Sequence, residues 1–166
     1  MSIRLIYCLF ALVLFNLAAC ESFDVNVNDR VVHTPQPLFS DFEIPDEGLS
    51  QCLQRAISHG GISAASQLKD LNCSNAGIES LEGLTSFREL LKLRLSANRV
   101  EDVTAIVSLQ SLQELYLDGN AVVDPAPLYG LKSLRFLDLS GNPDLQCPGA
   151  GELALIQRVD LPRHCR

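Results

Sequence analysis

Apolar residues recur along the central part of the chain at an interval of 22 residues. Four columns of this pattern stay in register over four consecutive units, which indicates an array of repeated structural units. The columns are Leu68, Leu90, Leu112 and Leu134; Leu71, Leu93, Leu115 and Leu137; Cys73, Leu95, Leu117 and Leu139; and Ala76, Asn98, Asn120 and Asn142.

The spacing inside each unit predicts a short strand followed by a tighter turn. The two apolar positions separated by one residue place alternate side chains on one face, as in a β-strand. One unit cannot bury these side chains alone, so neighbouring units must stack. The second half of each unit has a spacing of three, which favours 3₁₀ turns over α-helix. Pro125 and Pro127 also argue against a helix in the third unit. The residues with this spacing are Ile78, Leu81, Leu84 and Phe87; Val100, Val103, Ile106 and Leu109; and Val122, Pro125, Leu128 and Leu131.

The pattern L-x-x-L-x-L-x-x-N is that of a leucine-rich repeat, and residues 68–142 resemble the 22-residue repeats of internalins and related bacterial proteins. The resemblance implies an α/β solenoid, a short horseshoe with parallel strands on its concave face and 3₁₀ or irregular structure on its convex side. It also implies that the concave face binds a protein partner. It carries over no catalytic residue.

An asparagine occupies the point where the predicted strand turns in three of the four units. Buried amide side chains at such positions can satisfy backbone groups that the turn leaves unpaired. We therefore expect a structural asparagine ladder, with a binding role as the alternative. Its members are Asn98, Asn120 and Asn142, and Ala76 interrupts the column in the first unit.

The amino terminus has the features of an export signal. Arg4 precedes an apolar segment over residues 5–15, which is too short for a spanning helix. The segment ends in Leu17-Ala18-Ala19-Cys20, which resembles a bacterial lipobox. That resemblance implies cleavage before Cys20 and acylation of its thiol. An ordinary secretory signal that happens to contain Cys20 is the alternative, and it would give a secreted or periplasmic protein.

The residue after Cys20 bears on localisation. In proteobacterial lipoproteins an aspartate at this position usually means retention at the inner membrane, whereas this chain has Glu21. By this resemblance the expected location is the outer membrane of the bacterial cell envelope.

Four further cysteines are expected to form two disulfides, because an exported chain with an even number of cysteines favours pairing. Cys73 occupies the inward strand column shared with Leu95, so it lies at the amino-terminal end of the core. Cys147 follows Val103 by 44 residues and continues an inward column at the other end. No C-x-x-C pair or histidine cluster points to a metal, so none is expected. The predicted pairs are Cys52–Cys73 and Cys147–Cys165.

Helical caps are predicted at both ends of the repeats. Residues 47–58 form an amphipathic helix that begins after Asp46 and ends at Gly60-Gly61, and it would bring Cys52 to Cys73. A short closing helix is predicted near the carboxyl terminus. Its apolar face consists of Leu153, Ile156 and Val159.

These elements divide the chain into five segments. They are a signal peptide at 1–19, a lipidated tether at 20–44, a helical cap at 45–67, the repeats at 68–146 and a carboxyl-terminal cap at 147–166. The tether has no sustained periodicity and contains Pro35 and Pro37, so we expect little fixed structure there. A short strand formed by its valines is the alternative; these are Val25, Val27, Val31 and Val32.

The outward positions of the strands form the candidate binding face. The register places Lys92 opposite Glu114, and Tyr116 between Arg94 and Asp138. Exposed aromatic residues beside arginine are typical of binding hot spots. A solvated sheet face with self-paired charges is the alternative. The candidate binding residues are Lys92, Arg94, Glu114, Tyr116, Phe136 and Asp138.

Charge and motif content narrow the function classes. The formal charge is −7, and loss of Arg4 with the signal would make it one unit more negative, which disfavours binding to nucleic acid. There is no G-x-S-x-G, phosphate loop or H-E-x-x-H, so we expect neither an enzyme nor a cofactor. The histidines stand apart, at His33, His59 and His164.

Three functions remain open from the sequence. The first is an envelope lipoprotein that binds a protein partner through its strand face. The second is a passive structural or spacer lipoprotein, and the third is a small regulator or inhibitor of an envelope enzyme. The sequence does not identify the partner or the oligomeric state.

Overall fold

The computed structural model describes residues 25–27, 30–33, 37–149 and 151–166. The chain divides into two compact units, Met1–Pro37 and Leu38–Arg166. The signal segment, Cys20 and Glu21 lie outside the described residues. In the described part of the chain, no helix is both long enough and apolar enough to cross a bilayer.

The first unit contains an antiparallel hairpin. Strand β1 (Val25–Val27) pairs with β2 (Arg30–His33), and the register shifts between Val25 and Asn26. Little fixed structure was the main expectation for this part of the tether. The structure instead follows the alternative that its valines form strand, and it adds a second, paired strand.

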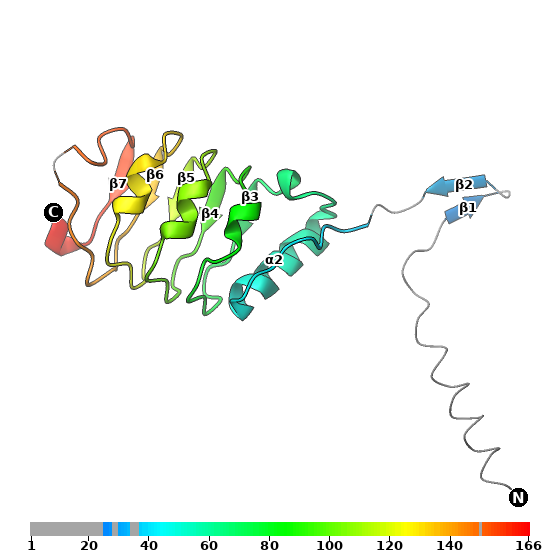
Figure 1. Ribbon diagram of the computed structural model, residues 1–166, viewed down its shortest axis with the longest axis horizontal. Helices are drawn as coiled ribbons and strands as arrows, with labels where there is room; N and C mark the ends of the chain where they lie inside the picture. Colours follow the sequence, from blue (N-terminus) through cyan, green and yellow to red (C-terminus); the bar gives the residue numbers. More distant parts are fainter. Residues whose placement is uncertain (1–24, 28–29, 34–36, 150) are drawn as a thin grey trace, which may run out of the picture. The chain divides into compact units, whose positions relative to one another are not determined.

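The second unit is a short leucine-rich-repeat solenoid built on a parallel sheet (Figure 1). Each strand has three residues, and its central residue is inward while its neighbours face out. Strands pair in sequence order, each shifted by one 22-residue repeat from the last. The strands are β3 (Asp70–Asn72), β4 (Lys92–Arg94), β5 (Glu114–Tyr116), β6 (Phe136–Asp138) and β7 (Arg158–Asp160).

Strand β7 replaces the closing helix that the sequence predicted. Phe136 pairs with Arg158 and Leu137 with Val159, so β7 continues the sheet in register. The helix prediction was wrong because a spacing of three between apolar residues is shared by helices and by these repeats. The columns in fact extend by 22 residues once more, to Ile156, Val159, Leu161 and His164.

The convex side consists of 3₁₀ turns, as the spacing of three predicted. These are η2 (Leu84–Ser86), η3 (Thr104–Ser108) and η4 (Ala126–Gly130), one in each of three successive repeats. The core lies between the turns and the sheet. Its inward leucines are 0–4% exposed, so stacking of units buries what one unit cannot.

Helix α2 (Glu47–Gly60) covers the first repeat. The Asp46 carboxylate caps it by accepting a hydrogen bond from the N–H of Leu49, and Gly61 in the left-handed region ends it. A disulfide joins Cys52 of the helix to Cys73, the pairing expected from the repeat columns. Both cysteines are buried, at 4% and 2% exposed.

Residues 38–44 pack on the repeats, although the sequence placed them in the tether. Phe39 and Phe42 contact each other and the buried Phe87, with ring centroids 5.5–5.9 Å apart. The N–H of Phe39 donates to the carbonyl of Ile62. A Cβ at Gly83 would overlap the Glu43 carbonyl, so the segment fits closely against this turn. The solenoid therefore begins before α2.

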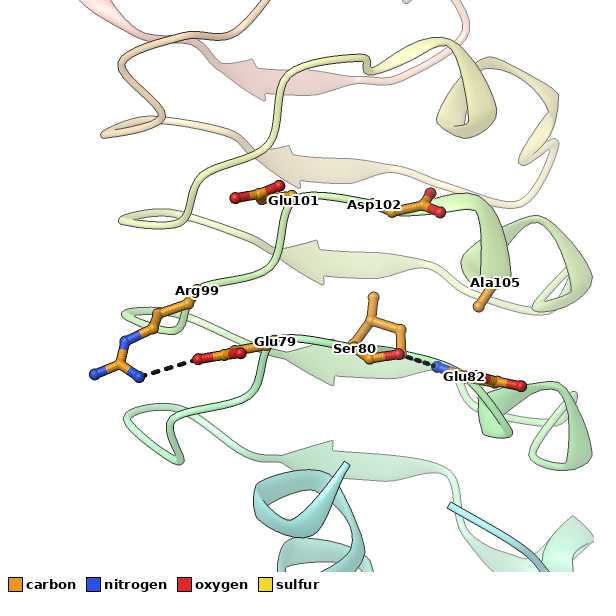
Figure 2. A pocket seen from close by; sticks show the side chains of 8 residues that line it. Glu79, Ser80, Glu82, Arg99, Glu101, Asp102 and Ala105 are labelled. Atoms are coloured by element: carbon orange, nitrogen blue, oxygen red, sulfur yellow. Dashed lines mark hydrogen bonds and ion pairs between the residues drawn. The ribbon is translucent and has the colours of Figure 1, made fainter. Parts of the chain in front are cut away.

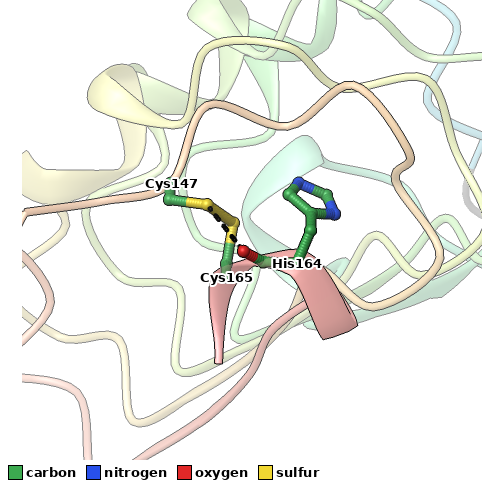
Figure 3. Close-up of side chains that lie close together, drawn as sticks. All are labelled: Cys147, His164 and Cys165. Atoms are coloured by element: carbon green, nitrogen blue, oxygen red, sulfur yellow. Dashed lines mark hydrogen bonds between the residues drawn. A yellow bond between two sulfur atoms is a disulfide. The ribbon is translucent and has the colours of Figure 1, made fainter.

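A second disulfide closes the carboxyl-terminal end by joining Cys147 to Cys165, again the expected pairing (Figure 3). Cys147 was expected to be inward, but it is exposed. Its equivalents in earlier repeats, Val103 and Pro125, are buried because another unit stacks on them. The fifth repeat contributes strand β7, but its described residues include no equivalent of Val103 to pack over Cys147, so this side chain remains accessible.

Candidate functional site

The outward side chains of β3–β7 form one continuous surface, which we call the strand face. It consists of Asp70 and Asn72, Lys92 and Arg94, Glu114 and Tyr116, Phe136 and Asp138, and Arg158 and Asp160. The sheet places successive repeats side by side, about 4.8 Å apart. Side chains from residues 22 apart therefore touch across the strands.

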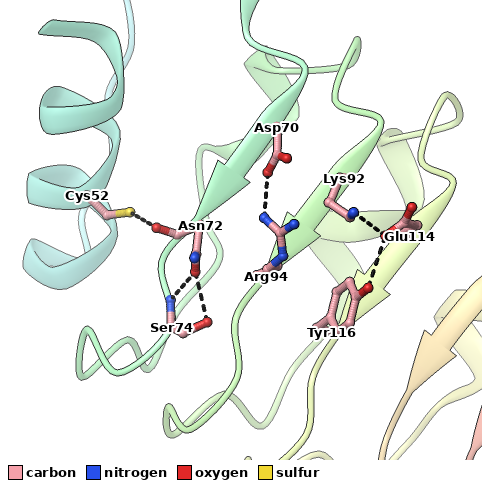
Figure 4. A network of polar contacts seen from close by, with 8 residues as sticks. All are labelled: Cys52, Asp70, Asn72, Ser74, Lys92, Arg94, Glu114 and Tyr116. Atoms are coloured by element: carbon pink, nitrogen blue, oxygen red, sulfur yellow. Dashed lines mark hydrogen bonds and ion pairs between the residues drawn. The ribbon is translucent and has the colours of Figure 1, made fainter. Parts of the chain in front are cut away.

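The structure brings most of the predicted binding residues together (Figure 4). Lys92 forms an ion pair with Glu114, and Glu114 also accepts a hydrogen bond of 3.0 Å from the Tyr116 hydroxyl. Arg94 pairs with Asp70 at 2.8 Å, a partner that the sequence did not assign to it. These contacts form two groups, one that joins β3 to β4 and one that joins β4 to β5.

Two aromatic rings lie at the centre of the strand face. The Tyr116 and Phe136 centroids are 4.8 Å apart, and both side chains are half-buried rather than exposed. Cationic groups border the pair, with Arg94 5.7 Å from the Tyr116 centroid and Arg158 5.3 Å from the Phe136 centroid. Cations at these distances are attracted to the faces of aromatic rings.

Asp138 is held by contacts within its own repeat. Its carboxylate accepts hydrogen bonds from the N–H and the hydroxyl of Ser140, so it fixes the turn after β6. Asn72 does the same for Ser74 in the first repeat. The sequence reasoning missed Arg158, since β7 was read as helix. Arg158 follows Phe136 by one 22-residue repeat, so extending the repeat columns by one unit would have identified it.

The local electrostatics favour a fixed arrangement. The hydrogen bond from Lys92 is the main reason that the pKa of Glu114 lies below its ordinary value. Burial first, and then the hydrogen bond to Glu114, raise the pKa of Tyr116. At neutral pH the carboxylate is therefore charged and the phenol is protonated, which maintains the hydrogen bond between them.

The asparagine ladder serves the fold. Asn98 accepts from the N–H of Ala76 and of Ile78, and donates to the carbonyls of Cys73 and Leu95. These bonds use both the oxygen and the nitrogen of a buried amide, leaving little for a ligand. Asn120 and Asn142 repeat the arrangement one and two units later.

An acidic hollow of about 710 Å³ lies outside the strand face (Figure 2). Glu79 is paired with Arg99 at 3.1 Å, and Asp102 accepts hydrogen bonds from the N–H and hydroxyl of Thr104. The Thr104 hydroxyl, followed by its N–H, lowers the pKa of Asp102. Ser80 and Asp124 cap the equivalent turns of the neighbouring repeats. Asp102 therefore belongs to a column of turn-capping residues.

The side chains of Cys147, His164 and Cys165 lie close together (Figure 3). Both sulfurs are in the disulfide, so neither is available as a thiolate ligand. His164 Nε2 lies 3.0 Å from the Leu145 carbonyl. His59 is at the exposed end of α2, away from this cluster. The structure thus explains His164 and the cysteines as parts of the closing turn.

Comparison with known proteins supports the fold. No family model and no curated protein matches the sequence. The crystal structure of an internalin (inlF) from Listeria monocytogenes is similar, with a TM-score of 0.62 and 21% identity over 72% of this chain. An internalin C2 (inlC2) from the same species has a TM-score of 0.45 and 29% identity over 51% of this chain.

The chain spans 37% of the length of each of these internalins. The likeness to inlF, at 21% identity, shows the repeat fold alone.

Proposed function

We propose that this protein is a lipid-anchored module of the bacterial cell envelope that binds a protein partner through its strand face. The observation that carries the proposal is the Tyr116–Phe136 pair with Arg94 and Arg158 at its borders. Aromatic residues and arginine dominate the energetics of protein interfaces, and they do so near the centre of the contact.

Preorganisation of the strand face strengthens this argument. The Tyr116 hydroxyl is tied to Glu114, and Glu114 is tied to Lys92. A partner would bind side chains that already occupy one geometry, so less conformational entropy is lost on association.

The size of the strand face sets the scale of the interaction. Five strands span roughly 24 Å across, and five residues run about 16 Å along each repeat, giving a footprint of about 380 Å². A standard interface buries about 800 Å² per partner. The strand face of one copy therefore supports a weak contact by itself.

The anchor is the second part of the proposal. Leu17-Ala18-Ala19-Cys20 supports acylation at Cys20, and Glu21 supports export to the outer membrane. Several acyl chains on one cysteine anchor a protein firmly, since each buried CH₂ contributes about 0.8 kcal/mol. Mass spectrometry of the mature amino terminus tests this directly. An acylated Cys20 with membrane fractionation that is lost in Cys20→Ser agrees with the proposal, whereas an unmodified Cys20 refutes the anchor.

Site-specific photo-crosslinking in intact cells tests the binding surface. A crosslinking residue at Tyr116 should give one discrete adduct, and mass spectrometry would identify the partner. The matched control is the same residue at Val107, which is 41% exposed and belongs to a convex turn. Adducts of equal yield at both positions, or none at Tyr116 in folded protein, would contradict binding through the strand face.

A further inference from the structure

Strand β7 has an open hydrogen-bonding edge. The N–H of Arg158 donates to the Arg135 carbonyl at 3.0 Å, and the Asp160 carbonyl accepts from the N–H of Leu139 at 2.8 Å. Backbone groups of successive strand residues point to opposite sides. The N–H and the carbonyl of Val159 therefore point away from β6, and the described residues provide no hydrogen-bond partner for either group.

The apolar layer behind this edge is incomplete as well. The inward residues of the fifth repeat are half-exposed, although their equivalents in the fourth repeat are 0–2% exposed. Leu155, just before the strand, is 80% exposed. The fifth-repeat residues are Ile156, Val159 and Leu161, and their equivalents are Leu134, Leu137 and Leu139. The end of the solenoid thus presents both unpaired backbone and apolar surface.

We propose that a second copy of this chain pairs antiparallel with β7, with Val159 opposite Val159 of the partner subunit. The charges of the strand select this occupant. Arg158 and Asp160 flank Val159 and form an ion pair of 3.0 Å on the strand face. A two-fold axis through Val159 places Arg158 opposite Asp160 of the partner subunit, and the reverse pair follows by symmetry. The edge is complementary to itself.

The other end of the sheet is not equivalent. Helix α2 packs against β3, and the Cys52–Cys73 disulfide joins the helix to the residue that follows this strand. Exposed edges of sheets are usually protected by like charges or covered, because they pair with other chains. Strand β7 instead carries one positive and one negative charge on either side of an apolar residue. A second copy in antiparallel register therefore places opposite charges, not like charges, across from each other.

Pairing of two copies would extend the strand face. A two-fold axis perpendicular to the sheet keeps both concave surfaces on the same side, so five strands become ten. The footprint then doubles from about 380 Å² to about 760 Å², close to that of a standard interface. The pairing itself does not depend on the proposed function, because it is measured with no other protein present.

Sedimentation equilibrium of the full chain in a density-matched detergent tests the pairing. We expect the buoyant mass to rise from monomer to dimer between about 1 μM and about 1 mM protein. Arg158→Asp and Asp160→Arg should each abolish the dimer, because each places like charges opposite one another. A one-to-one mixture of the two variants should restore it, because opposite charges then face across the interface.

The one-to-one mixture distinguishes loss of pairing at β7 from other reasons why a single variant would not dimerise. Recovery of the dimer also shows that both variants are folded. A wild-type chain that stays monomeric at every concentration up to about 1 mM would overturn the proposal. Single variants that still dimerise would place the contact elsewhere, and a mixture that stays monomeric would rule out the antiparallel register.

Discussion

The side-chain oxygen of Asn120 accepts a hydrogen bond of 3.0 Å from the N–H of Val100, in the repeat before its own. Its amide nitrogen donates to the carbonyl of Leu95 in that same preceding repeat and to Leu117 in its own. One buried side chain thus joins two units at the point where the strand turns. Stacking in this solenoid rests on polar as well as apolar contacts.

Asn120→Ala should therefore lower the free energy of unfolding by about 3 kcal/mol, because it leaves several buried backbone groups without a partner. Urea denaturation followed by circular dichroism measures the change. The matched control is Asn72→Ala, since Asn72 is an exposed asparagine whose side chain, among the described residues, bonds only to Ser74. Its cost should stay below about 1 kcal/mol. Equal losses in the two variants would show that the ladder has no special role.

A substitution in the turn before the ladder should raise the stability of the protein rather than lower it. Ala97 has φ of 55°, and one and two repeats later Gly119 and Gly141 occupy the same left-handed position. A residue with a Cβ is disfavoured there by about 1–2 kcal/mol, partly offset by the greater freedom of unfolded glycine. Ala97→Gly should stabilise the protein by about 0.5–1 kcal/mol. Ala121→Gly, where φ is not positive, should destabilise it by a similar amount, and the two melting temperatures should move in opposite directions.

Asp46 links the cap helix to the first repeat and predicts a pH dependence. Its carboxylate accepts hydrogen bonds from Leu49 in the helix and from Glu79 and Ser80 in the repeat. Burial raises the pKa of Asp46, but these backbone donors together with Gly48 outweigh it and hold the pKa below the ordinary 3.8. The stabilisation is complete above the unfolded-state pKa and is lost as the pH falls through the lower folded-state pKa.

Asp46→Asn keeps the hydrogen-bond acceptor and removes the charge. The variant should be less stable than wild type by about 1 kcal/mol at pH 7. The difference should shrink as the pH falls from about 5 to about 2, since the wild-type carboxyl becomes protonated. Thermal unfolding at a series of pH values measures this. A stability difference that stays constant over that range would contradict the assignment.

The two disulfides should differ in their rates of reduction. Cys52 and Cys73 are buried under α2, whereas Cys147 is exposed at the open end. Attack by an external thiolate requires access to a sulfur, so Cys147–Cys165 should be reduced first. Mild reduction, alkylation and peptide mapping follow the two bonds. Simultaneous reduction under native conditions would mean that the cap helix opens as readily as the closing turn.

Much of this fold follows from the 22-residue columns, because each leucine has the same environment one repeat further on. The register of Lys92 with Glu114 could be predicted for the same reason. The fifth repeat was missed because Ile156, Val159 and His164 replace the leucines and the asparagine. Their spacing is compatible with helix as well as with a repeat.

The segment before α2 could not be predicted in the same way. Phe39 and Phe42 are fixed by contact with Phe87, which is far away in sequence and belongs to no periodic pattern with them. The pairing of Arg94 with Asp70 is similar, since an arginine can reach several neighbours on a sheet and only packing selects one. Tertiary contacts, rather than sequence periodicity, determine both the position of this segment and the partner of Arg94.

Binding through the strand face is tested most directly by the affinity of the crosslinked partner, measured by calorimetry with the purified protein. Arg94→Glu and Phe136→Ala should each weaken binding by about tenfold or more, since they alter the centre of the strand face. Arg99→Glu is the charge-matched control, because Arg99 pairs with Glu79 outside that face. Its affinity should stay within about twofold of wild type. Unchanged affinity in the two strand-face variants, with folding intact, would contradict binding through the strand face.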